Sequence, residues 1–506
     1  SIRNAVIDVM NSSQSDIVVL AKGAGVALFG KIFGRALQLV VQVLLARLLG
    51  PMQYGLYVLG FTVLQIGQQV GLLGLDNGAV HFGGQALQRD QNDLPAIVRA
   101  TQLVTLGSAL AVGLLIFLLA PWFSIEIIHQ PQLVNVLRGF SLAVVFAAEL
   151  RVTSAITRLS RKTQFSVLSE DILPYLVSLG LIVLFAYWLK LSVTSAVWAV
   201  VAGFGAGWAL ALFFIRRLSF SVPVLGPVPV PLARKLLLYS SPIFFSIIFV
   251  YLLYGATVFM LGYYHSPQEV GIYQAASQIS TLSVVILLAF NAIFGPMISR
   301  LNEEAQRPQL DELYKVSTKW ALYASLPFLL ILLLMPHQVL QILYGAEYAG
   351  GAWTLVILTL AQAVNTATGA VGLLLVMHHH QNRWLLISGT SLLAGLLLDI
   401  WLIPRWGMTG AAIANACSIA ILYLLALFQV RSLLRLWPYD RRYWKGTVAA
   451  IGSAAVILAD LMIFPGRFMA QLVAATLSGM IVFLFLLWLL RFDQEDSQIF
   501  KFLLSR

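Results

Sequence analysis

Charged side chains are scarce in this chain of 506 residues: they make up 10% of it, against 59% hydrophobic residues. A soluble protein carries about 25% charged residues, so the composition excludes a cytosolic enzyme, a disordered chain and a fibrous protein. Cys417 is the only cysteine, which excludes an intrachain disulfide and a cysteine metal cluster. There is no Walker motif and no pairing of a nucleophile with a base, so we expect neither enzymatic activity nor a cofactor.

Three consecutive histidines, His378 to His380, are the one motif that suggests a metal. They fall in a short loop without a further ligand at a suitable spacing, so we interpret them as a solvated turn. We therefore predict no metal site.

Long apolar runs dominate the chain, and each is long enough to cross the hydrocarbon core of a bilayer. Backbone groups in lipid are satisfied only within a helix or a closed barrel, and runs this long without alternation are helical. We therefore predict an all-α membrane protein with fourteen transmembrane helices. The runs are residues 23–48, 55–81, 96–120, 134–157, 171–189, 193–215, 236–262, 270–297, 316–335, 351–377, 384–403, 408–430, 444–464 and 468–490.

The 32 Lys and Arg residues are distributed unevenly between the two sides of these runs. With fourteen helices and both termini in the cytoplasm, twenty-four lie on the cytoplasmic side, four on the other side and four inside helices. Such an excess is the positive-inside signal, and it explains the net charge of +11 without a nucleic-acid partner. We expect a multi-pass protein of the inner (cytoplasmic) membrane.

The chain also repeats itself at an offset of about 216 residues. Pro51, Gly55 and Tyr57 recur as Pro267, Gly271 and Tyr273. A duplicated unit with an even number of helices keeps its orientation, so we expect two six-helix lobes related by a pseudo-twofold axis along the membrane normal. The predicted parts are an N-terminal segment (1–22) with a short interfacial helix, an N-lobe (23–217), a cytoplasmic linker (218–235), a C-lobe (236–432), two further helices (433–491) and a cytoplasmic tail (492–506).

Polar residues inside the first span form the strongest candidate site. Lys31, Arg35, Gln38 and Gln42 are spaced by four, three and four residues, which places them on one helical face. A buried cation is costly in a membrane, so this face lines a wet cavity or meets a partner. Arginine and lysine suit a phosphate group. The alternative is that Lys31 reaches the surface and Arg35 pairs with Asp76 or Glu149.

Other spans supply further candidates. Arg151 adds a cation in the fourth span, and Tyr251 and Gln278 add neutral polar groups in the seventh and eighth. Cations in one half and amide or aromatic groups in the other suit an anion joined to a sugar. Asp76 and Glu149 are candidates for coupling to an ion, although Glu149 could also neutralise Arg151 or Arg35.

Two segments resemble a known family. ARLLGPMQYGLY (46–57) and DIWLIPRWGMTGAAIA (399–414) are similar to signatures of Wzx-like polysaccharide flippases, a branch of the multidrug/oligosaccharidyl-lipid/polysaccharide exporter superfamily. The resemblance implies a flippase that moves an undecaprenyl-pyrophosphate-linked oligosaccharide from the cytoplasmic to the outer leaflet by alternating access, for cell-surface polysaccharide biosynthesis. It implies Lys31 and Arg35 as the pyrophosphate contacts. Asp399 departs from the Asn that is common in relatives.

The partners expected on this basis are the lipid-linked oligosaccharide, membrane lipid, a glycan polymerase or biosynthesis complex, and a coupling ion, H+ or Na+. Two other functions remain open. A lipid II flippase would use a similar anion site. A multidrug and toxin exporter would need an accessible carboxylate inside the membrane, and the sequence instead places two cations on the first helix. A membrane glycosyltransferase is disfavoured by the short loops.

Overall fold

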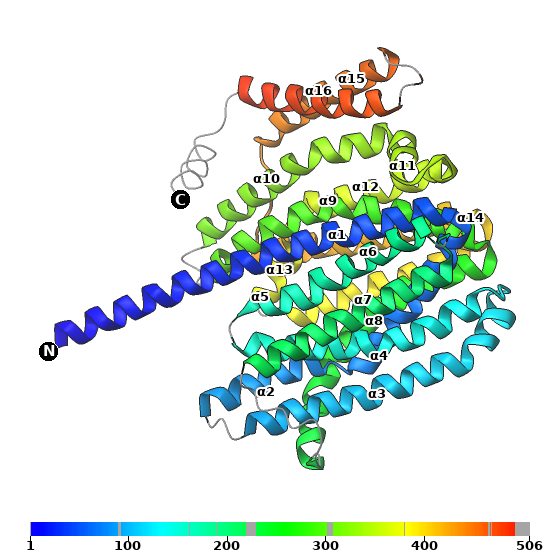
Figure 1. Cartoon of the computed structure of the whole chain (residues 1–506). Coiled ribbons are helices and arrows are strands. Elements are labelled where there is room, and N and C mark those ends of the chain that lie inside the picture. Colours follow the sequence, from blue (N-terminus) through cyan, green and yellow to red (C-terminus); the bar gives the residue numbers. More distant parts are fainter. Residues whose placement is uncertain are drawn as a thin grey trace. The chain divides into compact units, whose positions relative to one another are not determined.

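Helices are the only regular structure in the described part of the chain, as the sequence predicts. The computed structural model describes residues 2–89, 93–160, 162–188, 190–218, 229–300, 307–378, 380–463, 466 and 468–490 (Figure 1). Most of the predicted linker (219–228) and the whole predicted tail (492–506) lie outside these ranges. The chain divides into two compact units, Ser1–Gly271 and Ile272–Arg506, which we describe separately.

The first unit is built on long helices that pack side by side. Helix α4 contacts α1, α3 and α7, and α8 packs against α1 and α2. The helices are α1 (Ile2–Leu72), α2 (Leu75–Arg89), α3 (Leu94–Trp122), α4 (Leu133–Thr157), α5 (Thr163–Ser166), α6 (Leu173–Trp188), α7 (Val193–Arg217) and α8 (Val230–Tyr264). Because α8 belongs to this unit, the division after Gly271 differs from the predicted linker, and the two predicted lobes remain a prediction.

Two breaks interrupt the start of the chain. Gly50 has a φ of 73°, a value that favours glycine, and with Pro51 it bends α1 between the first two spans. A second break follows at Leu73 and Gly74, both with positive φ, and separates α1 from α2 within the second predicted span. Residues 2–22, for which we predict a short interfacial helix, are helical and continue into the first span without a non-helical residue. Their location at the membrane interface remains a prediction.

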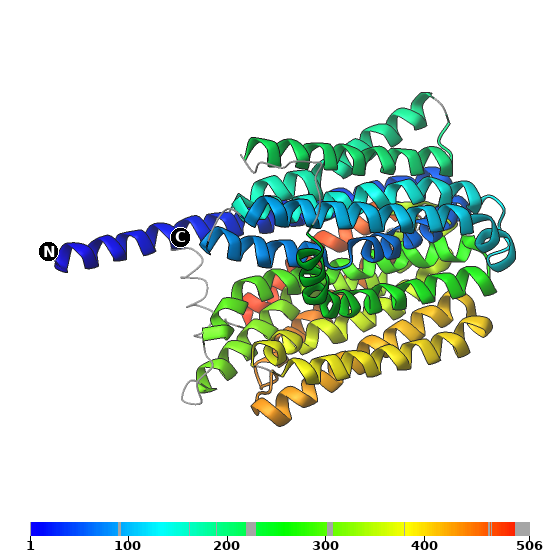
Figure 2. The ribbon, with the colours of Figure 1, turned by 90° about the horizontal axis from the view of Figure 1, so that it is seen from below.

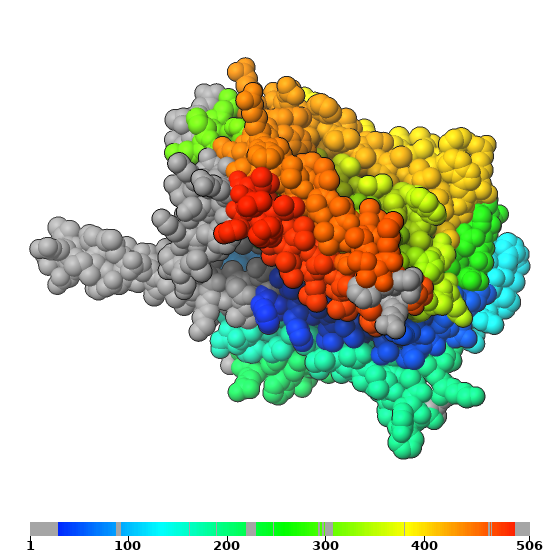
Figure 3. Space-filling view, turned by 90° about the horizontal axis from the view of Figure 1, so that it is seen from above, coloured from blue at the N-terminus to red at the C-terminus, as the bar shows by residue number. Residues whose placement is uncertain are grey.

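The second unit contains the rest of α9 (Pro267–Arg300) and seven further helices: α10 (Arg307–Leu334), α11 (Pro336–Tyr344), α12 (Ala352–Thr368), α13 (Val371–Met377), α14 (Gln381–Leu434), α15 (Tyr443–Ile463) and α16 (Phe468–Leu489). Helix α12 packs against α10 and α14, and α15 packs against α10 and α16. The α15–α16 pair, orange to red in Figure 3, presents apolar side chains outward, with Ile451 66% and Met469 61% exposed. Such exposure fits a surface that faces lipid.

The number of membrane crossings agrees with the prediction. Eleven helical segments are long and apolar enough to span a membrane, and α12 with α13, bent by 44°, makes a twelfth. Two of the eleven, Phe29–Leu87 and Gln381–Leu434, contain the non-helical residues Gly50 and Gly407, so each consists of two crossings. The described residues thus contain the fourteen predicted spans, and the chain is a multi-pass membrane protein.

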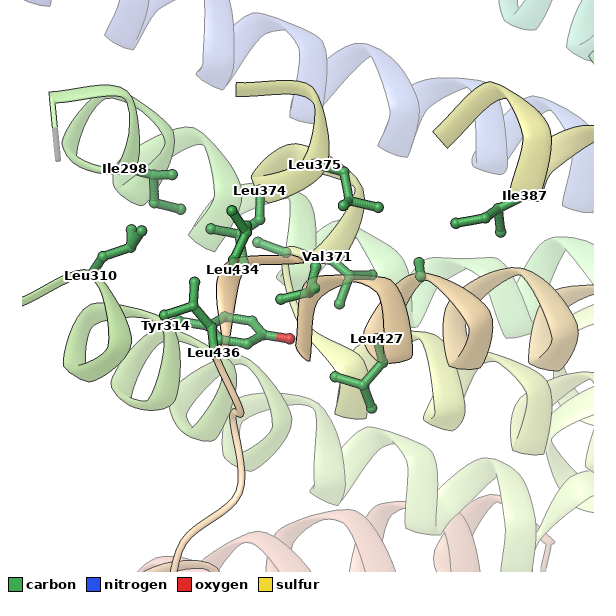
Figure 4. Packing of buried hydrophobic residues seen from close by; sticks show 13 residues of the cluster. Ile298, Leu310, Tyr314, Val371, Leu374, Leu375, Ile387, Leu427, Leu434 and Leu436 are labelled. Carbon is green, nitrogen blue, oxygen red and sulfur yellow. The ribbon is translucent and has the colours of Figure 1, made fainter. Parts of the chain in front are cut away.

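A buried cluster holds α9, α10, α13 and α14 together in the second unit (Figure 4). At its centre the hydroxyl of Tyr314 donates a hydrogen bond of 2.7 Å to the carbonyl oxygen of Thr368. Thr368 is the last residue of α12, where carbonyl groups lack helical partners. Tyr314 therefore supplies a hydrogen-bond donor to a buried helix end at the break before α13.

The two copies of the repeated motif meet each other within the first unit. A Cβ atom added to Gly55 would overlap the carbonyl oxygen of Pro267, and one added to Gly271 would overlap the carbonyl oxygen of Pro51. Equivalent residues thus make reciprocal contacts, the pattern that a twofold relation produces. This close approach of two backbones requires glycine at both positions.

Candidate functional site

A polar pocket of about 170 Å³ lies inside the first unit, where α1, α4, α6 and α8 approach one another. Its walls carry cations, carboxylates, amides and tyrosines that come from helical segments long and apolar enough to span a membrane. The polar lining residues are Arg35, Gln38, Gln65, Gln68, Arg151, Glu170, Asp171, Tyr175 and Tyr251. Of the predicted site residues, the pocket brings together Arg35, Gln38, Arg151 and Tyr251.

Glycines on α1 allow one wall of the pocket to form. A Cβ atom on Gly34 would fall 2.5 Å from the backbone oxygen of Asp171, and one on Gly30 would overlap the side chain of Val167. Small residues of this kind let two membrane helices approach closely. The segment opposite α1 is a π-helix, η4 (Val167–Ile172), which carries Glu170 and Asp171. Both carboxylates therefore stand beside the cationic face of α1.

Arg35 and Lys31 are exposed on that face. Arg35 lines the pocket, and both cations lie within electrostatic range of the Asp171 carboxylate. In the part of the chain that the structure describes, neither makes an ion pair within 4.0 Å. The predicted alternative, in which Arg35 pairs with Asp76 or Glu149, is not what the structure shows.

Arg151 is tied to two carboxylates. Its Nε atom lies 3.5 Å from Oδ2 of Asp76, and its guanidinium lies 3.9 Å from Oε1 of Glu170. Glu170 also binds Arg158 at 3.0 Å. These pairs form a network in which each carboxylate has a cationic neighbour. Asp76, a candidate for ion coupling, is thus the direct partner of Arg151.

Four predicted residues of the same unit do not line the pocket: Lys31 and Asp76, described above, and Gln42 and Glu149. Gln42 is buried, and its Oε1 atom accepts a hydrogen bond of 3.0 Å from the hydroxyl of Tyr54. Glu149 is only 4% exposed, and its Oε1 atom has no hydrogen-bond partner among the described residues. A carboxylate buried in this way is costly unless it binds a proton or a cation.

Gln278 lies on α9 in the second unit and is therefore not placed relative to the pocket. Sequence reasoning missed Gln68, Glu170, Asp171 and Tyr175. The two acids stand at the edge of the apolar run 171–189, where charges normally mark the end of a span. No group of three or more His, Cys, Asp and Glu residues that could hold a metal ion occurs within the described ranges.

Comparisons with known proteins agree with this architecture. Residues 44–352 match the family described as "Polysaccharide biosynthesis protein". The chain is 22% identical over 252 residues to the probable low-salt glycan biosynthesis flippase Agl15 of Haloferax volcanii. That match covers 50% of this chain and 53% of the relative, so it spans about half the length of each.

Two solved structures show that the fold is shared more widely. The lipid II flippase MurJ, in an inward closed conformation, superposes with a TM-score of 0.72 at 15% identity over 94% of this chain and 99% of that chain. An inward-facing multidrug resistance transporter of the MATE family, in the MOP superfamily, gives a TM-score of 0.65 at 15% identity over 81% of this chain and 98% of that chain. At 15% identity these two likenesses show the fold alone.

Proposed function

Because this chain belongs to the polysaccharide biosynthesis protein family, we propose that it is a flippase for an undecaprenyl-pyrophosphate-linked oligosaccharide. It moves this lipid from the cytoplasmic to the outer leaflet of the inner membrane by alternating access, with both termini in the cytoplasm. A polar headgroup cannot cross about 30 Å of hydrocarbon unaided. The task is binding and movement without bond chemistry, so the protein is not an enzyme.

The main support for this proposal is the position of Arg35 in the polar pocket. Its guanidinium lines a pocket within the membrane and makes no ion pair with a described carboxylate, so its donors are available to an incoming anion. Arginine offers a planar fork that matches phosphate oxygens. Lys31, one turn away on α1, adds a second positive charge for the pyrophosphate.

Neutral polar groups in the same pocket suit the sugar part of the substrate. Gln38, Gln65 and Gln68 present amides that both donate and accept hydrogen bonds. Tyr251 adds a hydroxyl and a ring from α8. A pocket of about 170 Å³ is smaller than an oligosaccharide, so the pocket binds the first sugar and the phosphates, and alternating access must widen it.

Two carboxylates are candidates for coupling transport to an ion, and they differ in whether a cation lies beside them. Asp76 is already neutralised by Arg151, whereas the Oε1 atom of Glu149 is buried without a described partner. Glu149 is therefore the stronger candidate to bind H+ or Na+ during the cycle. A proton or cation there would relieve the cost of the buried charge.

A second function, export of organic cations, is favoured by one observation. Glu170 and Asp171 line the pocket, and an accessible carboxylate inside the membrane is what a cation exporter requires. Against this, Arg35 and Arg151 line the same pocket and repel a cation. We rank the anionic substrate first because Glu170 is already shared between Arg151 and Arg158.

A binding experiment on the purified chain separates these functions. Thermal stabilisation is measured with a polyprenyl-pyrophosphate oligosaccharide, with lipid II and with tetraphenylphosphonium. We expect stabilisation by the first ligand, weakened about 10- to 100-fold by Arg35→Gln, because a hydrogen bond to a charged group contributes about 1.5–3 kcal/mol. Arg216→Gln, which removes an exposed cation from the last turn of α7, is the matched control. Stabilisation by tetraphenylphosphonium alone would contradict the proposal.

A further inference from the structure

Arg138 is a cation within the fourth span that does not line the polar pocket. It lies on α4, exposed, and its guanidinium is 4.9 Å from the centre of the Phe117 ring on α3. Within the described ranges no carboxylate lies within ion-pair distance of it. A cation on an apolar surface in a membrane is unfavourable without a partner, so its place calls for an explanation.

Arg138 lines a groove of about 540 Å³ between α3, α4 and α7. Helix α4 contacts both neighbours, and α3 and α4 run side by side in Figures 1 and 2. The walls are open to the surroundings: Leu114 is 60% exposed, Leu110 52% and Trp198 48%. Exposed side chains of this kind on a membrane protein face hydrocarbon, so the groove opens toward lipid. Its volume falls within the range of ligand pockets.

The groove is polar at one end and apolar at the other. Asn135 and Arg138 lie in the first two turns of α4, and Thr194 lies in the first turn of α7. At a rise of about 1.5 Å per residue, Arg138 is roughly 7–8 Å from the start of α4. Leu142 and Val145 line the groove one and two turns deeper. The polar end is therefore near a membrane surface and the apolar end near the middle of the leaflet.

This polarity matches a membrane lipid in both charge and depth. A phosphodiester carries a negative charge at the interface, and an acyl chain extends inward from it. The guanidinium can donate to phosphate oxygens in its plane while the Phe117 ring lies against it. Leu110, Leu114 and Leu142 offer an apolar track for the chain.

We propose that the groove is a binding site for a phospholipid, whose phosphate contacts Arg138 and whose acyl chain lies between α3, α4 and α7. By the predicted topology these ends of α4 and α7 face outward, so the lipid belongs to the outer leaflet. The site is separate from the polar pocket, because the two share no lining residue. The proposal does not depend on the identity of the transported substrate.

Native mass spectrometry of the full chain in detergent, titrated with dioleoyl phosphatidylglycerol, tests the site. We expect Arg138→Gln to weaken the tightest lipid-binding event by about tenfold, and Arg138→Lys to restore part of it. Arg405→Gln is the matched control, since Arg405 also lies over an aromatic ring, 4.8 Å from the centre of Trp401, but in the second unit. Equal lipid binding by Arg138→Gln and the unmodified chain would overturn the proposal.

A second variant tests the apolar track while the charge is kept. Leu114→Trp places a larger ring in the groove, and its position on the exposed face of α3 spares the core. We expect it to lower phosphatidylglycerol binding as Arg138→Gln does, with unchanged circular dichroism. Unchanged lipid binding in Leu114→Trp would contradict the placement of the acyl chain. Displacement of phosphatidylglycerol by a polyprenyl phosphate, but not by other phospholipids, would show that the occupant is the wrong lipid.

Discussion

The contact between the two copies of the repeated motif gives the sharpest test of the fold. Gly55→Ala adds one methyl group where the backbone carbonyl of Pro267 already stands. Alanine favours a helix by about 1 kcal/mol over glycine. Overpacking costs about 1–3 kcal/mol, and more where the neighbour cannot rotate away, as a backbone carbonyl cannot. We therefore expect net destabilisation of Gly55→Ala, although alanine is the better helix former.

A matched substitution cancels the effect of the higher helix propensity of alanine. Gly180 lies inside α6 with nothing within 4 Å of an added Cβ atom, so Gly180→Ala should be neutral or stabilising. The difference in unfolding free energy between the two variants, measured by thermal or denaturant unfolding in detergent, should be about 1–3 kcal/mol. Gly271→Ala should behave like Gly55→Ala, because its contact with Pro51 is the reciprocal one. If Gly55→Ala is as stable as Gly180→Ala, the close approach of the two motifs is refuted.

Two further predictions concern pairs of residues inside the units. A double-mutant cycle of unfolding free energies with Arg151→Gln and Asp76→Asn should give a coupling energy of about 1 kcal/mol, because the two side chains are 3.5 Å apart and Asp76 is largely buried. A coupling energy of zero would contradict the ion pair. Tyr314→Phe should lower the unfolding free energy by about 1–2 kcal/mol, because it removes the hydrogen bond to the Thr368 carbonyl and leaves that group buried; an unchanged stability would show that water or another donor replaces the hydroxyl.

Much of the fold follows from the sequence because the membrane imposes a simple rule. Each predicted apolar run corresponds to a helix or part of one, and the kink between the first two spans stands at Gly50, directly before Pro51, as local chemistry favours. The break at Leu73 and Gly74 was not predicted. It lies inside a continuous apolar run, where hydropathy does not reveal a change of backbone direction.

The residues that line the candidate pocket could be predicted only in part, for a related reason. Helical spacing placed Arg35 and Gln38 on one face, and both line the pocket. Helical spacing also places Gln42 on this face, but in the structure its Oε1 atom accepts a hydrogen bond from the hydroxyl of Tyr54. Glu170 and Asp171 were missed because they lie on a π-helix beside glycines of α1, and contacts between distant helices leave no periodic signal in a single sequence.

Transport in proteoliposomes tests the central claim most directly. A polyprenyl-pyrophosphate oligosaccharide is placed in one leaflet, and its arrival in the other is followed by accessibility to a glycan-modifying enzyme. Our account predicts transport by the unmodified chain and by Arg216→Gln, and a loss of about tenfold or more in Arg35→Gln, which removes the guanidinium from the polar pocket. Transport by Arg35→Gln at the unmodified rate, with the same amount of folded protein, would contradict it.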